Sequence, residues 1–201
     1  MTTVAVVDYK VGNIFSMTTA LQRVAFNVEV TADPIRLRAA DAIVLPGVGN
    51  WKVASDHIQP LKPLIREIVA EGKPFLGSCL GVQIMLEQSD EGAGDGIGLI
   101  NGRVRKFSSK VKIPHMGWNT LNKVKPVQLL DSVTDDMYFY FVHSFYPEPL
   151  DSKVTAAKTT YGIDFTSVIA DGNICGTQFH PEKSGKAGSL ILENFKRMVK
   201  R

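Results

Sequence analysis

The chain has 201 residues, of which 44% are hydrophobic and 21% charged, as in an ordinary globular protein that can bury one core. Its net charge is only +3, and its basic residues are spread along the chain apart from a final cluster at 196–201, so nothing indicates a nucleic-acid surface. No apolar run reaches the length of a membrane span, the N-terminus lacks the basic start of a signal peptide, and the two cysteines give neither a disulfide framework nor a zinc spacing.

Predicted strands and helices alternate through the first half of the chain. Helical spacing of apolar residues predicts a helix within residues 14–24 and another over residues 58–71, which Gly72 closes. Apolar runs predict buried strands at residues 4–7, 28–30, 41–45 and 73–76. This alternation is typical of right-handed βαβ units, so we expect a mostly parallel central sheet flanked by helices.

The second half of the chain has a different pattern, which begins with a flexible turn at residues 92–96. A last amphipathic helix is predicted to begin near Ser184. Short runs of strand-forming residues lie between them at 104–107, 137–142, 154–157, 165–169 and 174–179. We interpret these runs as an antiparallel extension of the sheet, within a single α/β domain that spans residues 1–201.

The segment GSCLG at residues 77–81 follows a predicted strand and precedes a helical pattern. Glycines two before and two after Cys79 allow a tight turn from strand to helix, and the helix dipole at that point favours a thiolate. A buried structural cysteine is the alternative interpretation of these five residues. A reducing cytoplasm suits a free thiol nucleophile, so we expect a cytoplasmic protein. Cys175 lies in a strand-like run and is predicted to be a small core residue.

The segment QFHPE at residues 178–182 supplies a candidate base, His180, and a candidate acid to orient it, Glu182. Side chains at i and i+2 of an extended segment point to one side, so the carboxylate can hold the imidazole in one tautomer. A histidine near a proline is otherwise an ordinary loop residue. Together with Cys79, the pair makes the arrangement of nucleophile, base and orienting acid that covalent catalysis uses, and we predict a Cys-His-Glu triad.

Three further segments are candidates for the same site. The segment PGVG at residues 46–49 ends a predicted parallel strand, and it is either a plain turn or a source of backbone N–H groups for an oxyanion, beside the N–H of Leu80. The segment PHMGWN at 114–119 belongs either to a contact surface or to the core, and its spacing does not decide. The segment VHSF at 142–145 leaves a core strand and is placed to line a pocket. His143 itself, like His57, is predicted to be a structural or surface residue, because no partner is visible in the sequence.

These motifs together resemble the class I glutamine amidotransferases, a family with a flavodoxin-like α/β fold and a Cys-His-Glu triad. The match runs from Asp8 to the last helix. Within the family, PHMGWN at 114–119 and HPEKS at 180–184 are similar to the glutaminase subunits of imidazole glycerol phosphate synthase, which serve histidine biosynthesis. The residues that match the nucleophile motif of the family are Gly77, Cys79, Leu80, Gly81 and Gln83.

The resemblance implies that the chain hydrolyses glutamine to glutamate and ammonia without a metal or an organic cofactor. It also implies a heterodimer with a (β/α)₈-barrel cyclase, in which ammonia reacts with the intermediate PRFAR to give imidazole glycerol phosphate and an aminoimidazole carboxamide ribonucleotide. The site that it implies comprises the catalytic residues Cys79, His180 and Glu182, oxyanion donors at Val48 and Leu80, substrate contacts at Gly47, Gly49, Gln83, Glu91, Ser144 and Phe145, and partner contacts at Asn13, Met116, Trp118 and Lys183.

The chain departs from the usual family pattern at Lys10, at the pair 50–51, at Ser78 and at Val82. We expect Lys10 and Trp51 to alter loop packing or the partner-facing surface. Three alternatives stay open at this point. Another class I glutaminase, such as the pyridoxal phosphate synthase subunit, would share the triad without PHMGWN, a cysteine esterase or peptidase would need no partner, and a binding module would leave the triad idle.

Overall fold

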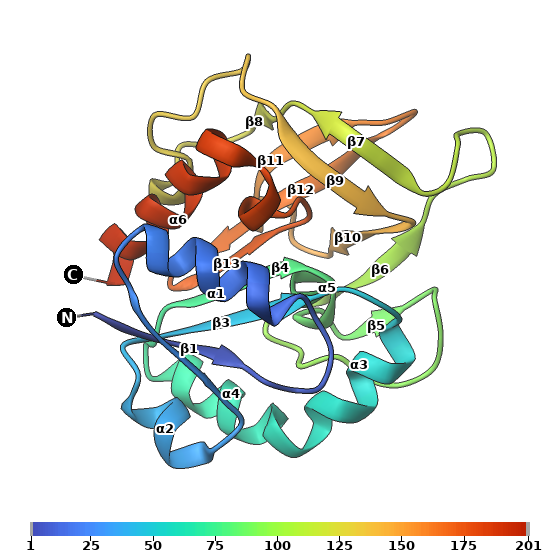
Figure 1. Ribbon diagram of the computed structural model, residues 1–201. Helices are drawn as coiled ribbons and strands as arrows, with labels where there is room; N and C mark the ends of the chain where they lie inside the picture. Colours follow the sequence, from blue (N-terminus) through green and yellow to red (C-terminus); the bar gives the residue numbers. More distant parts are fainter. Residues whose placement is uncertain (1, 200–201) are drawn as a thin grey trace.

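An eight-stranded sheet forms the centre of the molecule in the computed structural model, which describes residues 2–199 (Figure 1). Its first five strands run parallel, and the last three continue the sheet in antiparallel pairs. In spatial order the strands are β2 (Asn27–Thr31), β1 (Thr3–Val7), β3 (Ala42–Gly47), β4 (Phe75–Cys79), β13 (Ile174–Thr177), β12 (Asp164–Asp171), β11 (Thr155–Thr160) and β8 (Asn122–Lys123). The predicted parallel sheet with an antiparallel extension is therefore confirmed. Of the runs assigned to the extension, however, those at 104–107 and 137–142 lie in separate small sheets, and the run at 174–179 forms β13, which pairs in parallel with β4.

Helices cover both faces of this sheet (Figure 1). On one face lie α1 (Ile14–Arg23) and α6 (Gly185–Val199), and on the other lie α2 (Pro34–Ala39), α3 (Trp51–Ile58) and α4 (Lys62–Ala70). The strand β1 is buried on both sides, because Val4 and Val6 pack against the α1 and α6 side while Ala5 and Val7 pack against the other. Burial of each valine stabilises the fold by about 1.5–3 kcal/mol, which explains why this strand has a continuous apolar sequence.

One helical prediction needs correction, and two short helices were not predicted. The helix predicted over residues 58–71 is a short 3₁₀ turn at Gln59–Leu61 followed by α4. Pro60 and Pro63 lack the backbone N–H that a continuous helix would require, and each stands in the first turn of its own segment. The helices α2 and α3 were not predicted, although Asp33 and Asn50 cap their N-termini with side-chain oxygens.

Two small sheets flank the carboxyl edge of the main one. The first consists of β10 (Phe145–Pro149), β6 (Gly102–Lys106) and β5 (Gln88–Ser89), and the second pairs β7 (His115–Asn119) with β9 (Phe139–His143). The antiparallel register of the second pair sets His115 opposite His143. Within residues 2–199, the structure has no helix with the length and apolarity needed to cross a membrane.

Candidate active site

Cys79 ends strand β4 and immediately precedes the short helix α5 (Leu80–Ile84). Its backbone has φ 54° and ψ −110°, a strained conformation that puts the side chain above the edge of the sheet. The flanking glycines are required by space. A Cβ on Gly81 would lie 1.9 Å from the carbonyl oxygen of Leu45, and a Cβ on Gly77 would lie 2.6 Å from the sulfur of Met85. The predicted turn from strand to helix is present at this position.

The strand β13 brings the second half of the site to the same edge. It runs parallel to β4, with Thr177 opposite Ser78, so the residues that follow Thr177 emerge beside Cys79. Nδ1 of His180 lies 2.7 Å from Oε1 of Glu182. Both side chains are almost wholly buried, with 1% and 2% of their surface exposed. The two residues form the predicted pair, but Glu182 lies in a 3₁₀ turn (Pro181–Lys183) and not on the extended segment that we expected.

The electrostatic surroundings of His180 favour its charged form. Burial lowers the pKa of His180, but its interactions with Cys79 and with the hydrogen-bonded carboxylate of Glu182 outweigh this and raise the pKa to about 10. Its other nitrogen, Nε2, is buried and has no hydrogen-bond partner among residues 2–199. An imidazole held by a carboxylate on one side and free on the other is suited to exchange a proton with a thiol or a substrate.

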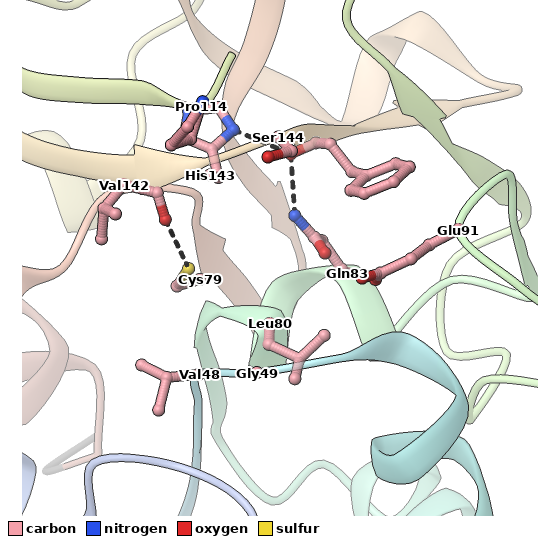
Figure 2. Close-up of a pocket in the computed structure, with 11 residues that line it drawn as sticks. Val48, Gly49, Cys79, Leu80, Gln83, Glu91, Pro114, Val142, His143 and Ser144 are labelled. Carbon is pink, nitrogen blue, oxygen red and sulfur yellow. Dashed lines mark hydrogen bonds between the residues drawn. The ribbon is translucent and has the colours of Figure 1, made fainter.

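A pocket of about 290 Å³ opens beside Cys79 (Figure 2). It contains the predicted oxyanion residues and all but one of the predicted substrate contacts. It is lined by Val48, Gly49, Cys79, Leu80, Gln83, Glu91, Pro114, Val142, His143, Ser144 and Phe145. Gly47 does not line it. That residue is needed for packing, since a Cβ there would come within 2.6 Å of both the backbone nitrogen of Gly81 and the Cβ of Leu80.

The polar groups of the pocket wall are held by other parts of the chain. Gln83 donates from Nε2 to the carbonyl oxygen of Phe145 at 2.8 Å. Glu91 accepts hydrogen bonds from Nδ2 of Asn50 at 3.1 Å and from the backbone N–H of Trp51 at 2.9 Å. Trp51 is fully buried, so its side chain takes part in the packing of this loop and not in the exposed surface; its expected effect relative to the family stays a prediction.

The predicted oxyanion segment leaves the sheet directly after β3. Gly47 is buried, whereas Val48 and Gly49 are exposed and follow the end of the strand. Gly49 has φ 120°, in a region that disfavours side chains. The Oη of Tyr9 donates a 2.8 Å hydrogen bond to the carbonyl oxygen of Pro46, so the start of the segment is fixed while its end is not.

Ser78, a second departure from the family pattern, faces the triad. Its Oγ lies 3.5 Å from Oε2 of Glu182, at the long limit of a hydrogen bond. The Nε2 of Gln178 lies 3.7 Å from the sulfur of Cys79.

The second cysteine, Cys175, lies away from this site. It is buried beside Met198, and burial raises its pKa to about 12, as suits the small core residue that was predicted.

The side chains of PHMGWN alternate between buried and more exposed positions along β7, so the core interpretation holds for His115, while a contact surface at the exposed positions stays a prediction. His115 is buried, whereas Met116 and Trp118 have exposed fractions of 63% and 56%. The other two predicted partner contacts also reach the surface. Asn13, the N-cap of α1, is partly exposed, and Lys183 is exposed. These four partner contacts stay predictions.

His143 lines the pocket, as expected for the segment 142–145, but its partner was not visible in the sequence. Nε2 of His143 lies 3.0 Å from Nδ1 of His115, its partner on β7. Burial lowers the pKa of His115 to about 4, and burial together with the nearby imidazoles of His115 and His180 lowers that of His143 to about 3. The pairing of His115 with His143 could have been predicted only if residues 115–119 had been identified as a strand beside 139–143. The apolar pattern of the sequence did not indicate a strand at 115–119.

Comparison with known proteins gives consistent results. The family described as glutamine amidotransferase class-I matches residues 5–198. The imidazole glycerol phosphate synthase subunit HisH of Methanothermobacter thermautotrophicus is 46% identical over 198 residues, which cover 98% of this chain and 99% of the relative. The HisH subunit of Nostoc punctiforme is 44% identical, over 100% of this chain and 98% of the relative. A crystal structure of a glutamine amidotransferase has the same fold, with a TM-score of 0.79 at 16% identity, over 98% of this chain and 99% of the other.

Proposed function

Because the chain belongs to the class I glutamine amidotransferases, and within them to the HisH subunits of imidazole glycerol phosphate synthase, we propose that it releases ammonia from glutamine at Cys79. One observation carries the assignment of the site. The buried His180–Glu182 pair stands at the edge of the sheet where Cys79 ends β4, and the pocket opens on the same sulfur. This arrangement supplies a nucleophile that lines the pocket, with a buried base and an orienting acid at the same edge of the sheet.

In the proposed reaction the Cys79 thiolate attacks the side-chain amide carbon of glutamine. His180 gives a proton to the departing ammonia, and the remaining acyl group forms a thioester with the sulfur. His180 then takes a proton from water, the hydroxide attacks the thioester, and glutamate leaves as the thiol is restored. Glu182 holds Nδ1 of His180 at 2.7 Å, so that Nε2 is the nitrogen that transfers protons.

Each tetrahedral intermediate carries an oxyanion that needs hydrogen-bond donors. The backbone N–H of Leu80 begins a helix directly after the nucleophile and is the first donor. A second N–H would come from the Val48–Gly49 segment, which lines the pocket opposite. We assign glutamine itself to the wall formed by Gln83, Glu91 and residues 144–145. The Phe145 carbonyl already accepts from Gln83, so this region would contact substrate through other atoms.

The relatives are named as subunits of a synthase, which implies a second subunit. We assign that role to a (β/α)₈-barrel cyclase, which would use the ammonia to convert PRFAR into imidazole glycerol phosphate and an aminoimidazole carboxamide ribonucleotide. Met116, Trp118, Asn13 and Lys183 would contact it, and the exposed apolar side chains of β7 support this choice. A cytoplasmic location is part of the proposal, because the thiol of Cys79 must remain reduced.

The test is a coupled assay of the chain together with the cyclase. We expect the wild-type pair to form imidazole glycerol phosphate from PRFAR with either glutamine or an ammonium salt. A Cys79→Ala pair should work with the ammonium salt alone, since the cyclase step does not need the thiol. Product formation from glutamine by the Cys79→Ala pair would remove Cys79 from the reaction, and failure of the wild-type pair to use glutamine would exclude the proposed function.

A further inference from the structure

A single backbone carbonyl behind the pocket accepts two hydrogen bonds from side chains. The oxygen of Phe145 lies 2.7 Å from Nδ1 of His143 and 2.8 Å from Nε2 of Gln83 (Figure 2). A carbonyl oxygen can only accept hydrogen bonds, so both nitrogens must carry hydrogen. The protonation of His143 at Nδ1 and the orientation of the Gln83 amide are therefore fixed by the same atom.

The proton positions of His115 follow from those of His143. A neutral His143 with hydrogen on Nδ1 has a lone pair on Nε2, so Nδ1 of His115, 3.0 Å away, must donate to it. The lone pair of His115 then lies on Nε2, which faces Nδ2 of Asn119 at 3.4 Å. The Asn119 amide is oriented independently, because its Nδ2 also donates to the carbonyl oxygen of Thr160 at 3.0 Å. The hydrogen bonds therefore form a row from Asn119 through His115 and His143 to the carbonyl oxygen of Phe145, and each donor in the row is directed toward Phe145.

A second branch runs from the same carbonyl to the nucleophile. Nε2 of Gln83 also lies 3.0 Å from Oε1 of Gln178, which must accept. The amide nitrogen of Gln178 is thereby directed at the sulfur of Cys79, 3.7 Å away. This places a hydrogen-bond donor beside the sulfur of the proposed nucleophile.

We propose that His115 and His143 are positioning residues, a pair of neutral imidazoles that holds the Phe145 carbonyl and thereby orients Gln83 at the pocket wall and Gln178 against Cys79. The proposal rests on the glutaminase function proposed above. The carbonyl is free to turn away when His143 no longer donates to it, or when His115 no longer fixes the tautomer of His143. The Gln83 amide is then no longer held in one orientation. Glutamine binding then weakens, while the triad itself stays in place.

Shape alone does not explain these two histidines. His115 stacks on Tyr161 with ring centroids 4.1 Å apart and on Phe141 at 4.9 Å, so a phenylalanine would fill the same apolar space. Both imidazoles are buried, and their lowered pKa values keep them neutral near pH 7. A neutral imidazole donates on one side and accepts on the other, which is what a directed row of hydrogen bonds requires and what a phenyl ring lacks.

The first experiment reads the tautomers directly in the wild-type chain. Correlation of ring nitrogens with carbon-bound hydrogens by ¹⁵N NMR distinguishes hydrogen on Nδ1 from hydrogen on Nε2. The chain has four histidines, which keeps the assignment simple. We expect His115 and His143 both to be neutral with hydrogen on Nδ1 at neutral pH. A cationic ring, or hydrogen on Nε2 of either residue, would overturn the proposal.

The second experiment compares variants with and without the donor. His115→Phe and His143→Phe keep the ring volume but remove the N–H, and we expect each to raise the KM for glutamine about tenfold with a smaller change in kcat. His115→Asn and His143→Asn keep an amide N–H near the position of Nδ1 and should restore much of the lost affinity. An unchanged KM in both phenylalanine variants would show that the pair is only structural.

A packing control is Phe107→Leu. Phe107 contacts both rings, with centroids 6.4 Å from His115 and 5.3 Å from His143, but its side chain donates no hydrogen bond. This variant should lower the melting temperature without changing the KM. A KM raised as much as in His115→Phe would contradict the proposal.

The two proposals fail in different ways. If the wild-type chain with its cyclase does not hydrolyse glutamine, the function is wrong, and the NMR spectrum still reports the tautomers of the pair. If the wild type is active and the phenylalanine variants match it, only the positioning role is wrong. Should a phenylalanine variant not fold, the asparagine variants and the spectrum decide.

Discussion

Tyr9 and Pro46 are joined by a buried hydrogen bond of 2.8 Å, from the phenol Oη to the carbonyl oxygen just before the proposed oxyanion segment. Burial raises the pKa of Tyr9 above its usual 10, so the hydroxyl is protonated and able to donate at neutral pH. The bond fixes the last residues of β3, whereas a Cβ built on Gly49 beyond them would lie 3.8 Å from Cγ1 of Val11, an ordinary contact distance. A movement of the proposed oxyanion segment would therefore involve Val48 and Gly49, since Asn50 and Trp51 are bound to Glu91.

Tyr9→Phe is expected to lower the free energy of unfolding by about 1–2 kcal/mol, because the Pro46 carbonyl loses a buried donor. Urea unfolding measures the loss. Tyr161→Phe is the matched control, since its hydroxyl donates to the Lys112 carbonyl at 2.8 Å in an exposed setting. Equal losses in the two variants would contradict the role given to Tyr9.

His180→Ala is expected to reduce glutamine turnover by as many orders of magnitude as Cys79→Ala, and Glu182→Gln by fewer. Triad members act as a unit, so the double variant Cys79→Ala with His180→Ala should resemble either single variant. Steady-state rates of glutamate formation provide the measurement. A double effect near the product of the two single effects would mean that the residues act separately.

The stability of the fold is expected to fall as the pH drops below 6.5. The pKa of His115 is lowered to about 4 and that of His143 to about 3 from the usual 6.5, so between these values the unfolded chain binds protons that the folded chain does not. At about pH 5 each histidine lowers the free energy of unfolding by up to about 2 kcal/mol, and this contribution is absent above pH 6.5.

Urea unfolding near neutral pH and near pH 5 tests this, with His115→Phe as the comparison. The variant lacks one of the two titrating groups and should lose less stability on acidification. The raised pKa of His180 acts in the opposite sense, but it is present in both proteins and cancels in the difference. An equal loss in wild type and variant would refute the prediction.

The isolated chain is expected to be a slow glutaminase that the cyclase, loaded with its nucleotide, accelerates. Rotation of the peptide between Val48 and Gly49 would present or withdraw one oxyanion donor, which is worth about 2.7–4 kcal/mol of transition-state stabilisation. Glutaminase rates with saturating glutamine, measured with and without the loaded partner, provide the test. Equal rates would mean that no such gate exists.

The sequence predicted the parts of the site that depend on local order along the chain. The turn around Cys79 was predictable because glycines at fixed distances make it possible, and His180 with Glu182 because they are two residues apart. The conformation around Glu182 was not, since Pro181 begins a 3₁₀ turn there and the two side chains still meet. A short contact between near neighbours can arise from more than one backbone path.

Contacts between distant segments were beyond the sequence. Gln83 and Gln178 are 95 residues apart, and His115 and His143 are 28 apart, so neither pair leaves a periodic signal. The strand β7 was not predicted because its outward residues, Met116 and Trp118, are apolar. The alternation of apolar and polar residues that indicates a half-buried strand is therefore absent from its sequence. The short helices α2 and α3 were not predicted for a different reason. Their capping residues are visible in the sequence, but too few apolar residues follow at helical spacing.

The place of β13 has a consequence for how the protein is made. This strand lies between β4 and β12 in the sheet, although almost a hundred residues separate it from β4 in the chain. While the chain grows on the ribosome, Cys79 is complete long before His180 has been synthesised. The newly made thiol therefore has no catalytic base beside it until β13 has been synthesised and has paired between β4 and β12.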